Sequence, residues 1–396
     1  MAQFFDTKEI FLKANKLYEN AQLFVAFMEQ KELFPYSIKL QKLKQSDIQK
    51  GYQTILKEIE SLKKLKLEIL YQECHFKTIG SQTLPMAIIF QNQEQFLKFI
   101  DKQDEFFEFV KNYEKIIKKY EVLQNTLLNK PKIIVQNQNN WDKLLKVCDF
   151  FLQNPRPNIY TRELAIEGVD TKFIENNKAI LDILLSNILP PEAFDSFVTS
   201  LGNYGFEKKY ALKYPLPLVR FRILDDGLKI ANLSDITLNI QEFMELNFAC
   251  ENVFIVENQI TTLSFPKLKN SIVIFGSGYA VGMLKDVAWL QEKKLYYWGD
   301  IDKDGFAILS QARSYFQNLQ SIFMDEEVIE LFKEYAVADE KNINIIRELN
   351  NLTLKEMQIY LKLQNNFYKI NFRLEQERIP FDYIQMRCNP NFSTLQ

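Results

Sequence analysis

The sequence predicts a multidomain α/β protein in which the first part is mainly helical and the last part holds a parallel sheet flanked by helices. A chain of 396 residues is too long for one ordinary hydrophobic core. Its composition, 47% hydrophobic and 25% charged, is that of a folded globular protein. Apolar strand-like runs alternate with helical patterns only in its second half. We therefore expect three domains, at 1–135, 136–235 and 236–396.

The first domain, residues 1–135, is expected to form mainly helices that act as a scaffold or arm. At 41–66 and again at 93–128, apolar residues recur at three- and four-residue spacing, which is typical of amphipathic helices. One short strand is expected at 87–90. This segment contains no motif of recognisable chemistry, so a partner-docking role is the plainest interpretation.

The middle segment predicts a small DNA-binding unit. A helix at 141–152 is followed by a short extended piece at 159–164 and then by a second helix that continues to about residue 185. This order resembles a helix-turn-helix or winged-helix unit. Lys172 and Lys178 are expected on the exposed side of the second helix, where they would contact DNA phosphates.

A strand is expected at 219–224, where polar and apolar residues alternate. Arg220 and Arg222 fall on one face of it, because successive side chains of a strand point to opposite faces. This face would meet DNA phosphates. A solvated edge strand is an equally good interpretation.

The last domain is expected to contain a parallel sheet, because short apolar runs alternate there with helical patterns. The runs are 253–256, 272–275, 295–298 and 321–324. Ligands of parallel sheets gather beyond the carboxyl ends of the strands. The first run ends on Glu257, the second on Gly276-Ser277-Gly278, and the third on a segment that contains Asp300 and Asp302.

These carboxylates predict a site for divalent cations. Mg²⁺ and Mn²⁺ prefer carboxylate oxygens and need only a few protein ligands when they assemble on phosphates. Asp300 and Asp302, two residues apart, project from the same side of the backbone. Glu257, from a neighbouring strand, would bind a second ion or act as a general acid or base. Two such ions suit phosphoryl transfer.

Three other interpretations of these motifs were weighed. The segment 300–305 begins like an EF-hand calcium loop, but a strand precedes it and the twelfth position is Gln311 instead of glutamate. One of the aspartates could simply cap the following helix. The glycines of Gly276-Ser277-Gly278 could cradle a nucleotide, but known phosphate loops carry a third glycine or a Lys-Ser/Thr pair.

Composition excludes several other classes of function. The only histidine is His75, which rules out histidine-based hydrolases and histidine-rich metal sites; we expect it to be a partly buried polar residue. The four cysteines form no CxxC pair, so buried thiols are expected. The start of the chain has no signal-peptide layout, so a cytoplasmic location is expected. A net charge of −2 means that any DNA contact uses local patches.

The order of the motifs resembles the JetD family, the nuclease subunits of Wadjet systems. The matching motifs are Asn154-Pro155-Arg156-Pro157, Gly168-Val169-Asp170-Thr171, Glu257-Asn258, Gly276-Ser277-Gly278-Tyr279-Ala280-Val281-Gly282, Tyr297-Trp298-Gly299-Asp300-Ile301-Asp302 and Leu374-Glu375-Gln376-Glu377-Arg378-Ile379. The resemblance covers roughly residues 140–380, and the segment 1–135 matches only loosely.

The resemblance implies a winged-helix (CAP-like) domain followed by a Toprim domain, as in the A subunit of topoisomerase VI. It implies a homodimeric endonuclease that uses Mg²⁺ or Mn²⁺ to cut double-stranded plasmid DNA, with an SMC ATPase, a kleisin and a winged-helix (KITE-like) subunit as partners. Glu257, Asp300 and Asp302 carry over as metal and catalytic residues, and Asp325 and Glu377 as secondary candidates. Asp304 stands where the family is expected to favour histidine, and no role is assigned to it.

Two other functions stay open at this stage. A topoisomerase-like transesterase would attack DNA with a tyrosine, and Tyr160 lies in the appropriate domain. A non-catalytic DNA-binding adaptor would use its carboxylates only to fold the sheet. Hydrolysis by a metal-activated water is the interpretation that we prefer.

Overall fold

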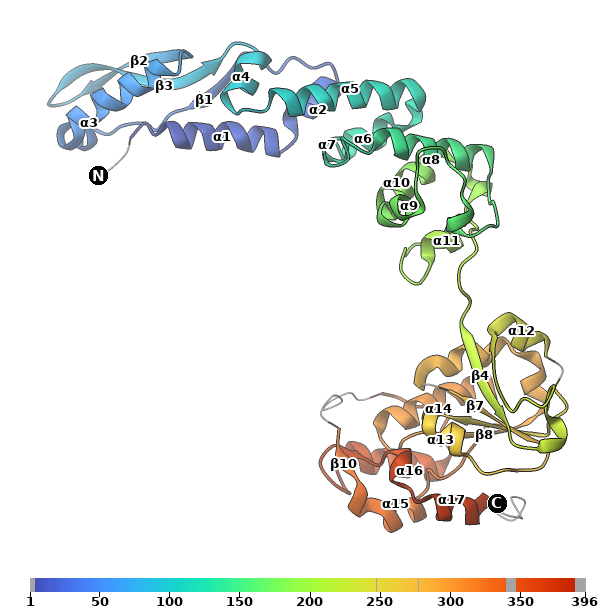
Figure 1. Cartoon of the computed structure of the whole chain (residues 1–396). Coiled ribbons are helices and arrows are strands. Elements are labelled where there is room, and N and C mark those ends of the chain that lie inside the picture. Colours follow the sequence, from blue (N-terminus) through green and yellow to red (C-terminus); the bar gives the residue numbers. More distant parts are fainter. Residues whose placement is uncertain (1–3, 247, 277, 340–346, 389–396) are drawn as a thin grey trace. The chain divides into compact units, whose positions relative to one another are not determined.

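The computed structural model describes residues 4–246, 248–276, 278–339 and 347–388, without the side chains of 278–280. The chain divides into two compact units, Met1–Tyr214 and Pro215–Gln396 (Figure 1). Each unit combines helices with a β-sheet, so the mixed α/β class is confirmed. The division into three domains stays a prediction.

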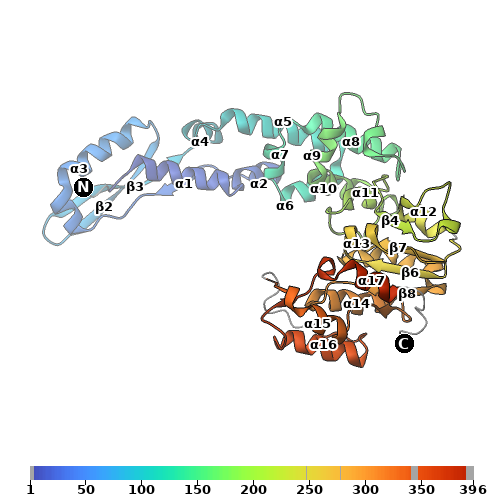
Figure 2. The same cartoon turned by 60° about the horizontal axis from the view of Figure 1, so that its bottom comes forward.

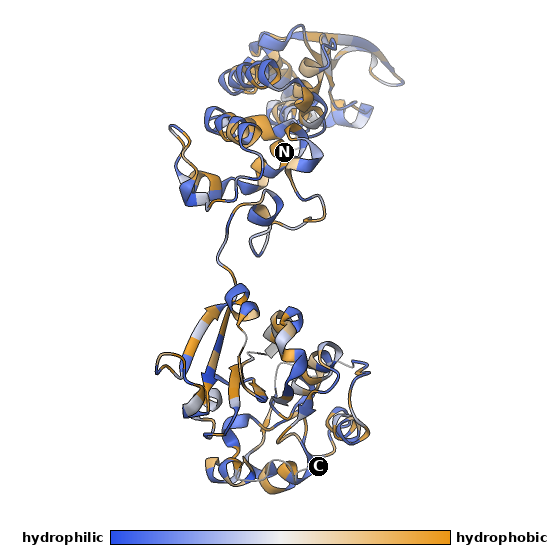
Figure 3. Ribbon diagram, turned by 90° about the vertical axis from the view of Figure 1, so that its right-hand side faces the viewer, coloured by the Kyte–Doolittle hydropathy of each residue, from blue (hydrophilic) through white to orange (hydrophobic). Residues whose placement is uncertain are grey.

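The first unit is mainly helical, as expected. Its helices are α1 (Thr7–Glu19), α2 (Gln22–Met28), α3 (Gln45–Lys64), α4 (Gln93–Phe99), α5 (Gln103–Lys119), α6 (Gln124–Asn129), α7 (Lys132–Gln136), α8 (Trp141–Gln153), α9 (Thr171–Asn176), α10 (Lys178–Ile188) and α11 (Gly205–Lys209), with 3-10 turns η1 (Glu121–Leu123), η2 (Thr161–Glu163) and η3 (Pro191–Ala193). Hydrophobic and hydrophilic residues are interspersed along the helices of the protein (Figure 3). One buried core extends from Phe4 to Leu212, so it crosses the predicted boundary at 135/136 without a break.

The first unit also contains an antiparallel sheet that is larger than the single strand predicted. Its order is β1 (Tyr36–Lys39), β3 (Gly80–Phe90), β2 (Glu68–Phe76), and α3 lies along the β2–β3 hairpin (Figures 1 and 2). Most side chains of β2 are exposed, so this strand shows little of the apolar alternation that predicts strands. The sequence signal for this hairpin is Gly80. It adopts a φ of 70° and closes the three-residue turn that follows Phe76.

The region predicted as a DNA-binding unit contains the predicted helices, but its predicted extended piece differs from the structure. The helix predicted at 141–152 is confirmed as α8, and the second predicted helix is present as two, α9 and α10. The extended piece predicted at 159–164 is wrong in its centre, where Thr161–Glu163 forms a 3-10 turn. The side chain of Glu163 accepts a hydrogen bond from the backbone N–H of Tyr160 at 2.7 Å, and this contact stabilises the turn.

The second unit is built around a six-stranded sheet. Its strands are β4 (Leu218–Ile223), β5 (Asp235–Asn239), β6 (Asn252–Val256), β7 (Ser271–Phe275), β8 (Lys294–Trp298) and β9 (Gln320–Ser321), with β10 (Val337–Ala338) and β11 (Phe372–Arg373) forming a separate pair. Its helices and turns are α12 (Ile240–Glu245), α13 (Gln259–Ser264), α14 (Lys303–Tyr315), α15 (Glu326–Phe332), α16 (Leu354–Gln364), α17 (Phe381–Cys388), η4 (Asp226–Leu228), η5 (Gly278–Asp286), η6 (Ala288–Glu292), η7 (Lys333–Tyr335) and η8 (Gln376–Arg378).

The order of the large sheet is β5-β4-β7-β6-β8-β9. Three of the four predicted strands are confirmed as β6, β7 and β8. The fourth, predicted at 321–324, is wrong in most of its length, because β9 ends at Ser321. These four strands pair in parallel. The sheet is mixed, because β4 and β5 add to it antiparallel. The strand predicted at 219–224 is therefore an internal strand of this sheet and not a solvated edge. Between β7 and β8 the expected helix is replaced by the 3-10 turns η5 and η6.

Glu356 joins three elements of the second unit. Its carboxylate accepts hydrogen bonds from Arg313 of α14 at 2.6 and 2.9 Å, from the hydroxyl of Ser321 in β9 at 2.6 Å, and from the backbone of Thr353 at 2.7 Å. Burial alone would raise the pKa of Glu356, but these bonds outweigh it and lower the pKa from 4.5 to about 2.

This lowered pKa predicts a loss of stability in acid. The contribution of Glu356 is fully present above its ordinary pKa of about 4.5, and it is lost as the pH falls towards 2. We expect the melting temperature of the second unit to fall steeply through this window in the wild type. In Glu356→Gln the slope should be shallower, because this group no longer titrates. Thermal unfolding from pH 7 to pH 2.5 measures both slopes, and equal slopes would contradict the assignment.

Three further observations concern membrane-spanning helices, the cysteines and the histidine. No helix among the described residues is long and apolar enough to cross a membrane. Three cysteines are buried as expected, but Cys74 is only partly so. His75 is exposed on β2 beside the hydroxyl of Ser81, and the expected partial burial is therefore wrong.

Candidate metal centre

The three predicted carboxylates are held at the carboxyl ends of two adjacent parallel strands. Val256, the last residue of β6, pairs with Trp298, the last residue of β8. The backbone N–H of Glu257 then donates to the carbonyl of Trp298 at 3.1 Å. Asp300 and Asp302 follow β8 directly and are 8% and 5% exposed. The register of the sheet therefore brings Glu257 close to both aspartates.

Burial raises the pKa of each of the three carboxyl groups. Burial is the largest cause for Glu257, and repulsion from Asp300 and Asp302 adds to it, so that its pKa is about 7 instead of 4.5. Burial likewise raises the pKa of Asp302 to about 6 and that of Asp300 above its ordinary value. The ionised form of each carboxyl group is thus destabilised by its surroundings.

Asp302 also begins the helix that follows β8. Its Oδ1 atom accepts a hydrogen bond from the backbone N–H of Gly305 at 2.7 Å, which caps α14. Glycine is required at 305, since a Cβ atom there would lie 2.0 Å from the carbonyl oxygen of Asp300. The capping role that we weighed for one aspartate therefore belongs to Asp302, whose Oδ2 atom does not take part in it.

Arg373 lies against both aspartates, and sequence reasoning did not find it. Its Nη2 and Nε atoms donate to Oδ2 of Asp300 at 2.8 and 3.2 Å, and its Nε atom lies 3.5 Å from Oδ2 of Asp302. The next residue, Leu374, bridges to Ile301 through two backbone hydrogen bonds. The only signal in the sequence was its position directly before the Leu374–Ile379 motif.

Gln376 connects the ends of both strands and was also missed. It is 1% exposed. Its side-chain amide donates to the carbonyl of Trp298 at 2.5 Å and accepts from the backbone N–H of Asn258 at 3.2 Å, while its own N–H donates to Oδ1 of Asp300 at 3.1 Å. Buried polar groups of this kind fix their neighbours, because any unpaired partner would be destabilising. Gln376 therefore positions Asp300.

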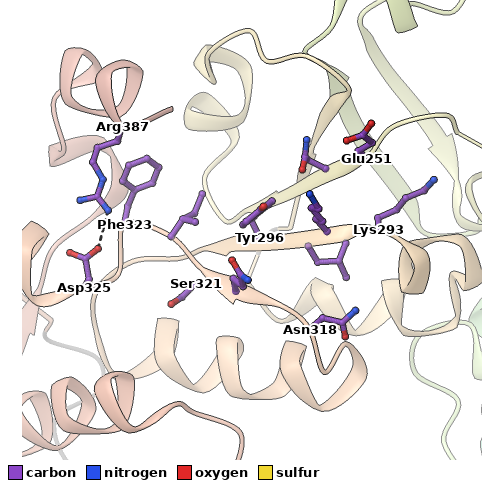
Figure 4. A pocket seen from close by; sticks show the side chains of 13 residues that line it. Glu251, Lys293, Tyr296, Asn318, Ser321, Phe323, Asp325 and Arg387 are labelled. Carbon is purple, nitrogen blue, oxygen red and sulfur yellow. Dashed lines mark hydrogen bonds and ion pairs between the residues drawn. The ribbon is translucent and has the colours of Figure 1, made fainter. Parts of the chain in front are cut away.

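The secondary candidates lie in different surroundings. Glu377 accepts a hydrogen bond from the side chain of Asn258, next to Glu257. Asp325 caps α15 through the N–H of Val328 at 2.9 Å and pairs with Arg387 at 3.4 Å. It lines one end of a cavity of about 580 Å³, whose other end is lined by Glu251 and Lys293 (Figure 4).

The glycine-rich motif after β7 is only partly described, because Ser277 lies outside the described residues. At Gly276, a Cβ atom would lie 2.8 Å from the Ile255 side chain. Close packing of β7 on β6 therefore requires this glycine, a reason that is independent of nucleotide binding.

The four candidate DNA-binding residues differ in exposure. Lys172 is exposed on α9. Lys178 pairs with the buried Glu207 at 2.6 Å, and Arg220 pairs with Asp235 through two bonds of 2.6 and 2.9 Å. Arg222 shares the face of Arg220 and donates to the carbonyl of Phe265 at 2.6 Å. Three of the four are thus engaged within the protein, and their role in binding DNA stays a prediction.

Tyr160 has surroundings that bear on the transesterase alternative. It lies in the first unit, and 47% of it is exposed. The Nζ atom of Lys213 lies 6.0 Å from the centre of its ring. Tyr160 is thus about half exposed, with a cation near its ring, and a nucleophile acting on DNA would need such access.

The chemistry of the acidic centre fits a divalent cation, although its present geometry is that of an ion pair. The donors are carboxylate oxygens in excess of positive charge, the ligands that Mg²⁺ and Mn²⁺ prefer. Within the described ranges, no three acidic, cysteine or histidine side chains are grouped so that they could hold a metal ion as they stand. Instead, a guanidinium group lies against both aspartates.

Comparison with known families assigns the chain. The family model for the C-terminal part of the Wadjet protein JetD matches residues 211–388, which include the whole acidic centre. Residues 211–388 of the chain belong to the JetD family. A second family model, described as the N-terminal part of an uncharacterized protein conserved in bacteria (DUF3322), matches residues 7–186. Curated proteins gave no match. Membership of the JetD family confirms the predicted resemblance and implies a component of a multi-subunit Wadjet system.

Proposed function

We propose that the protein is the DNA endonuclease subunit of a Wadjet complex and that it hydrolyses phosphodiesters of small circular DNA with Mg²⁺ or Mn²⁺. The observation that carries the proposal is the convergence of Glu257, Asp300 and Asp302 at the ends of adjacent parallel strands. In this proposal the second unit is a Toprim-type catalytic domain, and the helices α8 to α11 belong to a winged-helix-like DNA-binding region.

Each carboxylate has a distinct part in the proposed reaction. Asp300 and Asp302 would hold the cation through their Oδ2 atoms, since their Oδ1 atoms accept hydrogen bonds from backbone N–H groups. Bound divalent ions supply charge stabilisation and an activated water. Glu257, with a pKa of about 7, would take a proton from the attacking water near neutral pH. Gln376 would keep Asp300 in place throughout.

The proposed partners follow from family membership together with the motif resemblance. A Wadjet component acts in a multi-subunit system. We propose that this system comprises an SMC ATPase, a kleisin and a KITE-like winged-helix subunit, and that the nuclease works as a homodimer on double-stranded plasmid DNA. Lys172 is the leading candidate for a DNA contact, because it is the exposed member of the predicted set.

Linearisation of a small supercoiled plasmid tests this function. The reconstituted complex, supplied with ATP and Mg²⁺ or Mn²⁺, should cut with wild-type protein and lose at least about 100-fold of that activity with Asp300→Ala. Glu330→Ala, which removes an exposed carboxylate on α15, is the matched control and should cut normally. Full activity of a folded Asp300→Ala protein would refute the mechanism and favour the DNA-binding adaptor.

The same assay separates hydrolysis from transesterification. The transesterase remains a second candidate because Tyr160 is about half exposed and its ring lies near Lys213. For hydrolysis we expect Tyr160→Phe to cut normally and to leave a free 5′ phosphate. A loss of cutting in this variant, with protein covalently attached to DNA in the wild type, would establish the transesterase instead.

A further inference from the structure

Arg373 is surrounded by acidic groups. Besides the contacts with Asp300 and Asp302, its Nε atom lies 3.8 Å from Glu375. Glu375 is shared, because Arg378 donates to its other oxygen at 3.0 Å. Three carboxylates therefore converge on one guanidinium group, whose positive charge offsets part of the repulsion between Asp300 and Asp302.

The atoms that Arg373 contacts are those that a cation would need. In each aspartate, Oδ1 is engaged by a backbone N–H: that of Gln376 for Asp300 and that of Gly305 for Asp302. In each, Oδ2 faces Arg373. A cation bound by both Oδ2 atoms would therefore have to occupy the place that the guanidinium group now takes.

The side chain of Arg373 is able to leave this place while its backbone stays. The backbone is fixed on both sides, since Arg373 pairs with Val337 of β10 and the following Leu374 bonds to Ile301. The side chain is 35% exposed, so its path to solvent is open. An arginine stem has enough rotatable bonds to swing the charged group outwards without a change in the sheet.

We propose that Arg373 is a positioning residue that occupies the cation site of Asp300 and Asp302 in the metal-free protein and yields it when a divalent cation binds. This inference rests on the proposed function, because it takes these aspartates as the metal ligands. In the metal-free protein the acidic centre is then an ion pair, which stabilises the fold. A divalent cation must displace Arg373 to bind, so binding requires a higher cation concentration.

Calorimetric titration of Mn²⁺ into the full-length chain, without DNA, tests the inference. Arg373→Met removes the competing charge and keeps the length of the stem, so Mn²⁺ should bind at least about tenfold more tightly than to the wild type. Arg378→Met is the matched control, because this residue pairs only with Glu375 among these three acids, and its affinity should change less than about twofold. Unchanged or weaker binding to Arg373→Met overturns the proposal.

Thermal unfolding gives a second measurement that does not depend on activity. In chelator, Arg373→Met should melt below the wild type, since it leaves buried carboxylates without a counter-ion. Saturating Mn²⁺ should raise its melting temperature by more than it raises that of the wild type. If Arg373→Met does not fold, Arg373→Lys replaces it: a single ammonium group competes less well than the two-pronged guanidinium, so affinity should again rise. Weaker Mn²⁺ binding to Arg373→Lys than to the wild type overturns the proposal.

The outcome for Arg373 is distinguishable from that for the nuclease. If Mn²⁺ binds and Arg373→Met tightens it, but plasmid is never cut, the placement of Arg373 stands and the nuclease is refuted. If cutting depends on Asp300 while Arg373→Met leaves affinity unchanged, only the inference about Arg373 is lost. If neither protein binds Mn²⁺, both are overturned.

Discussion

Asp302→Asn is expected to lower plasmid cleavage by at least about 100-fold while the second unit remains fully folded. Asn retains the Oδ1 atom that accepts the N–H of Gly305, so the cap of α14 persists. It replaces Oδ2 by an uncharged amide group, so a divalent cation loses a charged ligand. Linearisation of a supercoiled plasmid by the reconstituted complex measures the loss.

Asp302→Ala separates the two roles of this side chain. It should be as inactive as Asp302→Asn, and it should also lower the free energy of unfolding by about 1 kcal/mol because the helix cap is lost. Chemical denaturation of both variants in chelator measures the contribution of the helix cap to the free energy of unfolding. Cleavage at the wild-type rate by Asp302→Asn would show that Asp302 serves the helix alone.

Glu356→Ala is expected to destabilise the second unit by about 3–5 kcal/mol. The substitution leaves the largely buried guanidinium of Arg313 without its carboxylate partner, and the hydroxyl of Ser321 loses its acceptor. Removal of one member of a buried ion pair has an effect of this size, whereas exposed pairs contribute less than about 1 kcal/mol. Urea unfolding followed by the fluorescence of Trp289 and Trp298, which both lie in the second unit, measures the change.

A suitable control removes a carboxylate of the same unit that is exposed. Glu330 pairs with Lys333 on the surface of α15, and both side chains are about half exposed. Glu330→Ala should change the free energy of unfolding by less than about 0.5 kcal/mol. If Glu356→Ala lost no more than this, the three-element junction at Glu356 would not contribute to stability.

The parallel strands of the second unit were predictable because their signal is local. The strands β6, β7 and β8 are buried apolar runs, and acidic residues stand just beyond the ends of β6 and β8, at Glu257 and Asp300. Parallel pairing then places these residues together without further information. The strand ends, and hence the main features of the candidate centre, follow from this pattern alone.

Other features depend on contacts that the local sequence does not encode. Arg373 and Gln376 reach Asp300 from 73 and 76 residues away, and no periodicity predicts such pairs. The hairpin of β2 and β3 was missed because an exposed strand has no apolar face to reveal it. Lys178 was expected to be exposed, but Glu207, 29 residues later, engages it.

The contacts of Gln376 also determine when the acidic centre can form during synthesis of the chain. The strands β6 and β8 and both aspartates leave the ribosome long before the segment that joins their ends. A nascent chain that stops short of residue 373 therefore contains the whole large sheet but neither the counter-ion nor the clamp of the acidic centre. The centre can therefore mature only after residues 373–376 have been made, and shorter chains carry an unassembled one.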